Sequence, residues 1–316
     1  MRQLDLFADP LPPPDPTMVA LGRGLPAHMR LGTSSWTFEG WKGLLYKRTY
    51  PTRERFVRES LREYASSGLF RTVGFDRSYY APLSEAEWAE QGALVPDDFI
   101  VCAKVWDRLT ARMFPDHPRY GERRGQVNLH YLDPVRFEEQ VLTPFVRGLG
   151  GKAGPLIVEL PPAPSATDPI AFADSLARFL VRAPPHRYAF ELREPQLLTR
   201  RYVDVLRDHP HASHVLNLHT RMPPLKDQVA RGALVNDTCV VRLMIPRGQR
   251  YAEMKERYAP FDRIHEVQRS MRDDVEDIVE RTGEAGADLF VIVNNKVEGC
   301  SVLTAMAIAE RAQRCQ

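Results

Sequence analysis

Short apolar runs alternate with helix-like stretches along this chain from residue 28 to its end. Eight runs are rich in β-branched and aromatic side chains, and each precedes a stretch whose apolar positions recur with helical spacing. The runs predict strands at residues 29–35, 70–76, 99–105, 155–160, 187–192, 214–218, 238–243 and 289–294. Eight strand–helix units predict a fold of the α/β class, a single (β/α)8 barrel of the TIM type.

The intervening stretches predict helices at residues 52–66, 84–92, 134–148, 169–182, 195–208, 224–232, 262–283 and 300–312. Ser84 stands three residues before Glu87, which is the spacing of a capping box. Asp133 and Asp168 each precede a proline that suits a first helical turn. Residues 106–133 and 244–261 are too long for simple turns, and we expect them to cover the mouth of the barrel.

Nearly every predicted strand ends in a charged or amide side chain. Chemistry in TIM barrels is carried at these ends, because the loops that follow vary freely above a rigid barrel. Three of the ends are cations, and arginine binds carboxylate or phosphate with two parallel hydrogen bonds. Lys104, Arg193 and Arg242 therefore predict a pocket for an anionic ligand, either a phosphate-bearing small molecule or a nucleic acid.

Two glutamates end adjacent predicted strands, so their carboxyl groups are expected to lie close together. A pair of carboxyl groups in unlike environments can divide into an acid and a base. We predict Glu191 first and Glu159 second as acid/base groups of a hydrolase or lyase, with Lys104 as a further catalytic group. The alternative is that Glu191, Arg193 and Lys104 only pair with one another as a structural network.

Further ligand contacts are predicted from other polar and aromatic side chains near the strand ends. Amides orient hydroxyl or phosphate groups, and aromatic rings stack on a sugar or a base. The predicted set, beyond the two arginines, is Trp36, Asp76, Tyr79, Tyr80, Asn217, His219, Asn294 and Asn295. The alternative for Asn294 and Asn295 is that they cap a loop.

We expect no organic cofactor, since the chain has neither a GxGxxG nor a GxxxxGK[ST] motif. Only a few side chains at the strand ends could bind a metal ion, and so small a set argues against a site for a divalent metal. They are Asp76, Glu159, Glu191 and His219. Four scattered cysteines without CxxC spacing argue against a zinc module or a disulfide framework.

The formal net charge of +2 is too small for the whole surface to attract nucleic acid or a membrane, so such contacts need a local patch. We expect a cytoplasmic protein without membrane contact, because the chain has no long apolar run and no apolar leader. One candidate patch is the 106–133 connection, where arginines alternate with aromatic residues in a pattern that suits nucleic acid. The alternative is a lid whose arginines pair with Asp107, Asp116 and Glu122.

Residues 1–27 differ from the rest of the chain. Five prolines between Pro10 and Pro16 favour an extended conformation, so we predict a flexible tail at 1–27 and one barrel domain at 28–316. The tail begins with a pentapeptide that resembles the one with which bacterial replication and repair proteins bind the DNA sliding clamp. Its predicted contacts are Gln3, Leu4, Leu6 and Phe7. The alternative is a terminal strand that docks on the bottom of the barrel.

Eight motifs in order along the chain point to a known family. Among them are Gly32-Thr33-Ser34-Ser35-Trp36, Tyr79-Tyr80, Leu132-Asp133-Pro134, Leu160-Pro161-Pro162, Glu191-Leu192-Arg193, Val241-Arg242-Leu243 and Asn294-Asn295. With these motifs the chain resembles the YecE-like family, domain of unknown function 72. The resemblance implies a TIM-like barrel with a shared polar pocket, and no settled reaction. Positions that depart from the family pattern are Gly74, Asp76, Glu159 and Glu194.

Three functional hypotheses follow. The first is an enzyme of nucleotide or nucleic-acid metabolism, associated with DNA repair and tethered to the clamp by residues 3–7. The second is a small-molecule enzyme that acts on a sugar phosphate or a carboxylate. The third is a non-catalytic adaptor that senses a ligand.

Overall fold

The protein is described from a computed structural model that covers residues 10–162 and 167–315. Eight parallel strands form one sheet in the order β1-β8-β7-β6-β5-β4-β3-β2. They are β1 Met29–Thr33, β2 Thr72–Phe75, β3 Ile100–Lys104, β4 Ala153–Leu160, β5 Tyr188–Leu192, β6 Ala212–Leu218, β7 Thr238–Leu243 and β8 Asp288–Val293. All eight predicted strands are confirmed.

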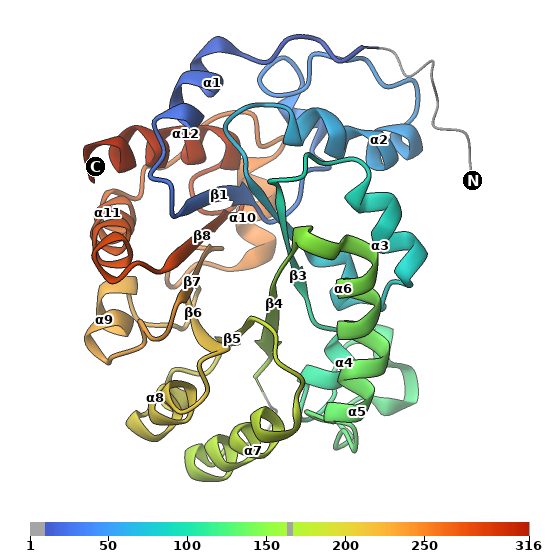
Figure 1. The fold of residues 1–316 in the computed structure, drawn as a ribbon, viewed down its shortest axis with the longest axis vertical. Coiled ribbons are helices and arrows are strands. Elements are labelled where there is room, and N and C mark those ends of the chain that lie inside the picture. The colour runs from blue at the N-terminus through green and yellow to red at the C-terminus, as the bar shows by residue number, and fades with distance from the viewer. Residues whose placement is uncertain (1–9, 163–166, 316) are drawn as a thin grey trace.

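The sheet curls into a nearly closed barrel at the centre of the molecule (Figure 1). The last strand, β8, pairs with the first strand, β1. On the other side of β1, the Arg71 amide just before β2 donates a hydrogen bond to the Leu31 carbonyl at 3.0 Å. This close approach needs Gly32, since a Cβ there would lie 2.1 Å from the Thr72 carbonyl oxygen. The α/β barrel of the TIM type predicted from the sequence is therefore confirmed.

Helices surround the barrel (Figure 1). The α-helices are α1 Pro16–Arg23, α2 Arg53–Ala65, α3 Glu85–Gly92, α4 Asp107–Thr110, α5 Pro134–Phe137, α6 Thr143–Leu149, α7 Pro169–Arg182, α8 Arg200–Arg207, α9 Leu225–Ala230, α10 Tyr251–Tyr258, α11 Arg269–Ala285 and α12 Ser301–Ala312. Shorter 3-10 segments are Glu39–Trp41, Asp76–Tyr79, Pro118–Arg123, Gly150–Lys152, Pro195–Leu197 and Gln313–Cys315, and a π-helical segment spans Glu138–Leu142. No helix in the described ranges is long and apolar enough to cross a membrane.

The predicted helix starts are confirmed where local caps define them. Ser84 forms the capping box with Glu87, and Asp168 accepts a hydrogen bond from the amide of Ile170. The helix predicted at 262–283 begins only at Arg269. The residues just before Arg269 instead form hydrogen bonds with the loop after β8. There the Gln268 amide donates to the Glu298 carboxylate at 2.7 Å.

The prediction of a flexible tail is wrong for residues 16–25. Asp15 caps α1, and Pro16 lies in its first turn, where a missing N–H costs nothing. The buried side chains of Met18, Leu21 and Leu25 join the hydrophobic core, and α1 lies beside α12 (Figure 1). The predicted clamp-binding pentapeptide at residues 3–7 lies outside the described residues.

Substituting Gly22 tests whether α1 is an integral part of the fold. A Cβ at Gly22 would lie 1.8 Å from the carbonyl oxygen of Gly68, so we expect Gly22→Ala to lower the free energy of unfolding by about 1–3 kcal/mol. Gly151→Ala is the matched control, because an added Cβ there would have no described atom within 4 Å apart from those of Gly151 and its two chain neighbours. Urea unfolding measures both variants, and equal midpoints would show that α1 contributes little.

Candidate functional site

A pocket of about 320 Å³ opens at the carboxyl ends of the strands. Side chains from the loops after most strands line it, as the strand-end pattern predicted. Of the predicted site residues, those that line the pocket are Asp76, Tyr79, Tyr80, Lys104, Glu159, Arg193, His219 and Asn294. Residues that the sequence analysis did not select, among them Thr220 and Tyr251, complete the wall.

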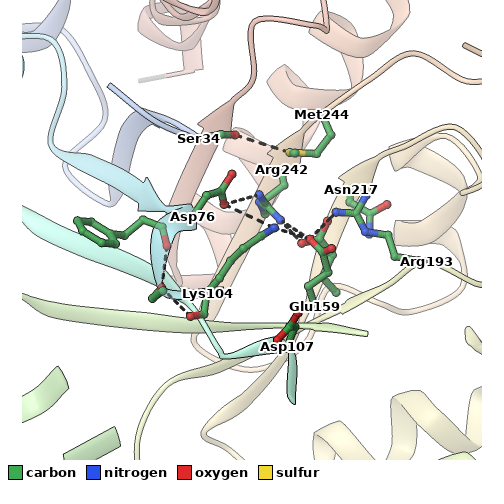
Figure 2. A network of polar contacts seen from close by, with 12 residues as sticks. Ser34, Asp76, Lys104, Asp107, Glu159, Arg193, Asn217, Arg242 and Met244 are labelled. Carbon is green, nitrogen blue, oxygen red and sulfur yellow. Dashed lines mark hydrogen bonds and ion pairs between the residues drawn. The ribbon is translucent and has the colours of Figure 1, made fainter. Parts of the chain in front are cut away.

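The floor of the pocket is a network of ion pairs centred on the carboxylate of Glu159. Glu159 Oε2 lies 2.7 Å from Lys104 Nζ and 2.7 Å from Arg193 Nη2. The same oxygen lies 3.4 Å from Arg242 Nη1. Figure 2 shows these side chains converging from different strands. One carboxylate therefore binds all three predicted cations.

Two further carboxylates complete the network. Asp76 Oδ1 lies 3.2 Å from Arg242 Nη2 and 3.6 Å from Lys104 Nζ. Glu191 pairs with Arg242, and its Oε1 lies 2.7 Å from Arg193 Nη2. Three cations thus face three carboxylates, so the network as a whole carries no net charge. This geometry matches the alternative in which the strand-end charges bind one another.

The network has a buried layer and a layer that reaches the pocket. Glu191, Arg242 and Asn217 are fully buried, and the Asn217 amide donates to the Leu192 carbonyl at 2.9 Å. The side chains of Lys104 and Glu159 keep 10% and 13% of their surface exposed. Glu191, predicted as the first acid/base group, therefore lies beneath the pocket, whereas Glu159 lies at its surface.

Charges in the network fix the protonation state of Glu159. Burial alone would raise its pKa, but Arg193, Lys104 and Arg242 outweigh burial and hold the pKa well below its ordinary value. Burial also lowers the pKa of His219 to about 4, and Arg193 contributes to the shift. At neutral pH the pocket therefore presents an ionised Glu159 and a neutral His219. The Nδ1 atom of this imidazole has no hydrogen-bond partner within the described residues.

Two tyrosines and the 106–133 connection form one side of the pocket. Tyr79 lies under Lys104, with Nζ 4.4 Å from the ring centroid. Arg119 from the long connection lies over the rings of both Tyr79 and Tyr80, and it pairs with Asp107 at 2.6 Å. The connection therefore reaches the pocket, and this arginine pairs with a local acid as the lid alternative predicted.

Two further predicted ligand contacts, besides the buried Asn217 and Arg242, do not line the pocket. Trp36 is buried in the core, with its ring centroid 5.2 Å from that of Phe75, so it is not placed to stack on a ligand. The Asn295 Oδ1 accepts hydrogen bonds from the Ser301 amide at 2.7 Å and the Ser301 hydroxyl at 2.8 Å. Asn295 thus holds the start of α12, which is the loop-capping alternative.

Lys296, which follows Asn295 in the loop after β8, was not predicted as a site residue. Lys296 Nζ lies 3.4 Å from Asn294 Oδ1 and 4.1 Å from the centroid of the Tyr251 ring. Both of these neighbours line the pocket. The available signal was a basic residue just beyond the last strand end, in the position where barrel enzymes carry functional groups.

The residues described here, 10–162 and 167–315, contain no cluster of three or more His, Cys, Asp and Glu side chains that could hold a metal ion. The three carboxylates that meet at the barrel mouth are instead bound to lysine and arginine.

The fold and the sequence place the chain among known proteins. A family model described as "Protein of unknown function DUF72" matches residues 30–316. The chain belongs to this family. The resemblance inferred from the motifs is thereby confirmed at the level of DUF72. No curated protein matches the chain.

Solved DUF72 structures share the fold of this DUF72 member. A protein from Thermotoga maritima MSB8 aligns with a TM-score of 0.60 at 18% identity, over 89% of this chain and 98% of that one. A protein from Enterococcus faecalis V583 aligns with a TM-score of 0.59 at 16% identity, over 90% of this chain and 95% of that one. At these identities the likeness concerns the fold alone.

Proposed function

We propose that the protein is an enzyme that acts on a small molecule bearing a phosphate or carboxylate group, bound in the pocket above Glu159. The observation that carries the proposal is a surplus of positive charge. The six groups of the network balance one another, and Lys296 beside them has no carboxylate within ion-pair distance among the described residues. An anionic ligand would compensate this charge.

The size of the pocket favours a small substrate over a nucleic acid. About 320 Å³ suits a small organic molecule, and the exposed ring of Tyr80 suits the face of a sugar. Glu159, ionised at the surface of the pocket, serves as the base. Lys104 and Arg193 bind the anionic end of the substrate. Glu191 holds the two arginines in place and is a positioning residue.

Ligand binding tests this function directly. We expect glycerol 3-phosphate to bind in isothermal titration calorimetry, and glycerol not to bind. Lys104→Gln removes a charge-assisted hydrogen bond worth about 1.5–3 kcal/mol, so affinity should fall roughly 10- to 100-fold. Lys226→Gln is the matched control, because this lysine is exposed on α9. Absence of phosphate-dependent binding, or equal affinities in the two variants, would contradict the proposal.

Tethering to the DNA sliding clamp through Gln3 to Phe7, and with it a role in DNA repair, stays a prediction from the sequence. Titration of a peptide of residues 1–16 against a purified sliding clamp tests it, with Leu6→Ala and Phe7→Ala together as the control. Binding that the control abolishes would support the tether.

A further inference from the structure

Lys296 is a buried amine beside the pocket. The residue is only 4% exposed, and it lies in the loop between β8 and α12. Its Nζ lies 4.1 Å from the centroid of the Tyr251 ring and 5.6 Å from that of Phe261. Among the residues that the structure describes, the one side-chain oxygen within hydrogen-bond distance of Nζ is Asn294 Oδ1, at 3.4 Å.

These surroundings differ from those of Lys104, which lines the pocket itself. Lys104 is bound by Glu159 at 2.7 Å and by Asp76 at 3.6 Å. Lys296 instead contacts the rings of Tyr251 and Phe261 and the side-chain amide of Asn294. No carboxylate in the described ranges forms an ion pair with it. A lysine held in this way is suited to chemistry that needs the free amine.

The charge state of Lys296 follows from these contacts. Burial lowers its pKa to about 8; Asp76 opposes the shift and Lys255 on α10 reinforces it. At pH 7.5 roughly a quarter of the molecules therefore carry a neutral amine, against about 0.1% for an ordinary exposed lysine. Lys296 thus has a lone pair available under physiological conditions.

We propose that Lys296 is a nucleophile that forms an imine with an aldehyde or ketone bound in this pocket. The inference rests on the proposed function, since the same pocket holds the substrate, and it narrows the substrate class to carbonyl compounds bearing a phosphate or carboxylate.

The reaction needs no oxidant or reductant. The Nζ lone pair attacks the carbonyl carbon, the C=O electron pair moves to oxygen, and a proton passes from nitrogen to that oxygen to give a carbinolamine. A proton from solvent then joins the hydroxyl group, which leaves as water, while the nitrogen lone pair forms the C=N bond of the protonated imine. The imine withdraws electrons from the adjacent carbon, whose proton Glu159 accepts, and an enamine forms. Such an enamine is the intermediate through which lyases break or form bonds to carbon.

Reductive trapping tests the proposal. Glyceraldehyde 3-phosphate and sodium cyanoborohydride are added to the full-length protein at pH 7.5, and peptide mass spectrometry follows each of its seven lysines. We expect Lys296 to be labelled at least ~10-fold faster than any other lysine, because it has far more neutral amine. Its rate should rise with pH and level off above about 8. Labelling at Lys296 no faster than at exposed Lys255 would overturn the proposal, as would preferential labelling of Lys104.

Two variants and one binding measurement complete the test. Lys255→Arg should keep the fast labelling, whereas Lys296→Arg should remove it. The comparison among lysines in the wild-type protein stands even if Lys296→Arg does not fold. Calorimetry with glycerol 3-phosphate is done on the same wild-type preparation. Phosphate-dependent binding without labelling of Lys296 would overturn the imine and leave the proposed function intact, whereas absence of both would overturn both.

Discussion

Replacing Glu191 with alanine is expected to lower the free energy of unfolding by about 3–5 kcal/mol. The Glu191 carboxylate is fully buried and pairs with the guanidinium groups of Arg193 and Arg242, whose side chains are 7% and 0% exposed. Without it, both cations keep their cost of leaving water but lose a charged partner. Urea unfolding at pH 7, followed by tryptophan fluorescence, measures the change.

An exposed ion pair provides the control for this experiment. Glu39 pairs with Arg53 at 2.8 Å, but both side chains are 65% exposed, so Glu39→Ala should cost less than about 1 kcal/mol. If Glu191→Ala costs no more than Glu39→Ala, the buried layer of the network contributes little to stability. The arginines would then be held by other contacts.

Glu159→Gln is expected to lower the free energy of unfolding by about 3 kcal/mol at neutral pH, because three cations lose their shared carboxylate. The effect depends on pH in a defined direction. The pKa of Glu159 lies well below its ordinary value in the folded protein, and in the unfolded chain a glutamate has a pKa of about 4.3. Its contribution is therefore fully present above about pH 5 and is lost as the pH falls through the folded-state pKa.

Unfolding of both proteins across the pH range measures this dependence. The difference in stability between the wild-type protein and Glu159→Gln should be constant above about pH 5 and should shrink below it. Glu253→Gln serves as a control, since this glutamate is 58% exposed and pairs with Arg250 at 3.7 Å. A difference that grows toward acid pH would mean that Glu159 is not held as an anion in the folded protein.

The two glutamates occupy different depths in one network. Glu159 and Glu191 lie side by side on β4 and β5, and they share Arg193 and Arg242. Only Glu159 reaches the pocket surface, where it can contact a substrate. The deeper carboxylate fixes the arginines, and the fixed arginines hold Glu159 in its ionised form. The arginines thus fix the position of this carboxylate at the surface of the pocket, which is the geometric requirement for a general base.

Local patterns in the chain were sufficient to predict most of the fold. Each strand is an apolar run that its own residues define, and Ser84 caps its helix through a contact only three residues away. The mouth of the barrel was also predictable, since parallel strands bring their carboxyl ends to one side. The helix at Pro16–Arg23 was missed because proline was interpreted as a helix breaker, although it is favoured in a first turn.

The pairing and depth of the charged side chains depended on the tertiary structure. Arg242 and Asp76 are separated by 166 positions in the sequence, and strand-end patterns could not show that they form an ion pair. Nor could they show that Glu159 reaches the pocket while Glu191 does not, because both end adjacent strands. The contact of Lys296 with Tyr251 likewise joins the loop after β8 to the first residue of α10, which lies 45 positions earlier in the chain. Secondary structure depends on neighbours a few positions away, whereas desolvation and ion pairing depend on which distant side chains the closed barrel brings together.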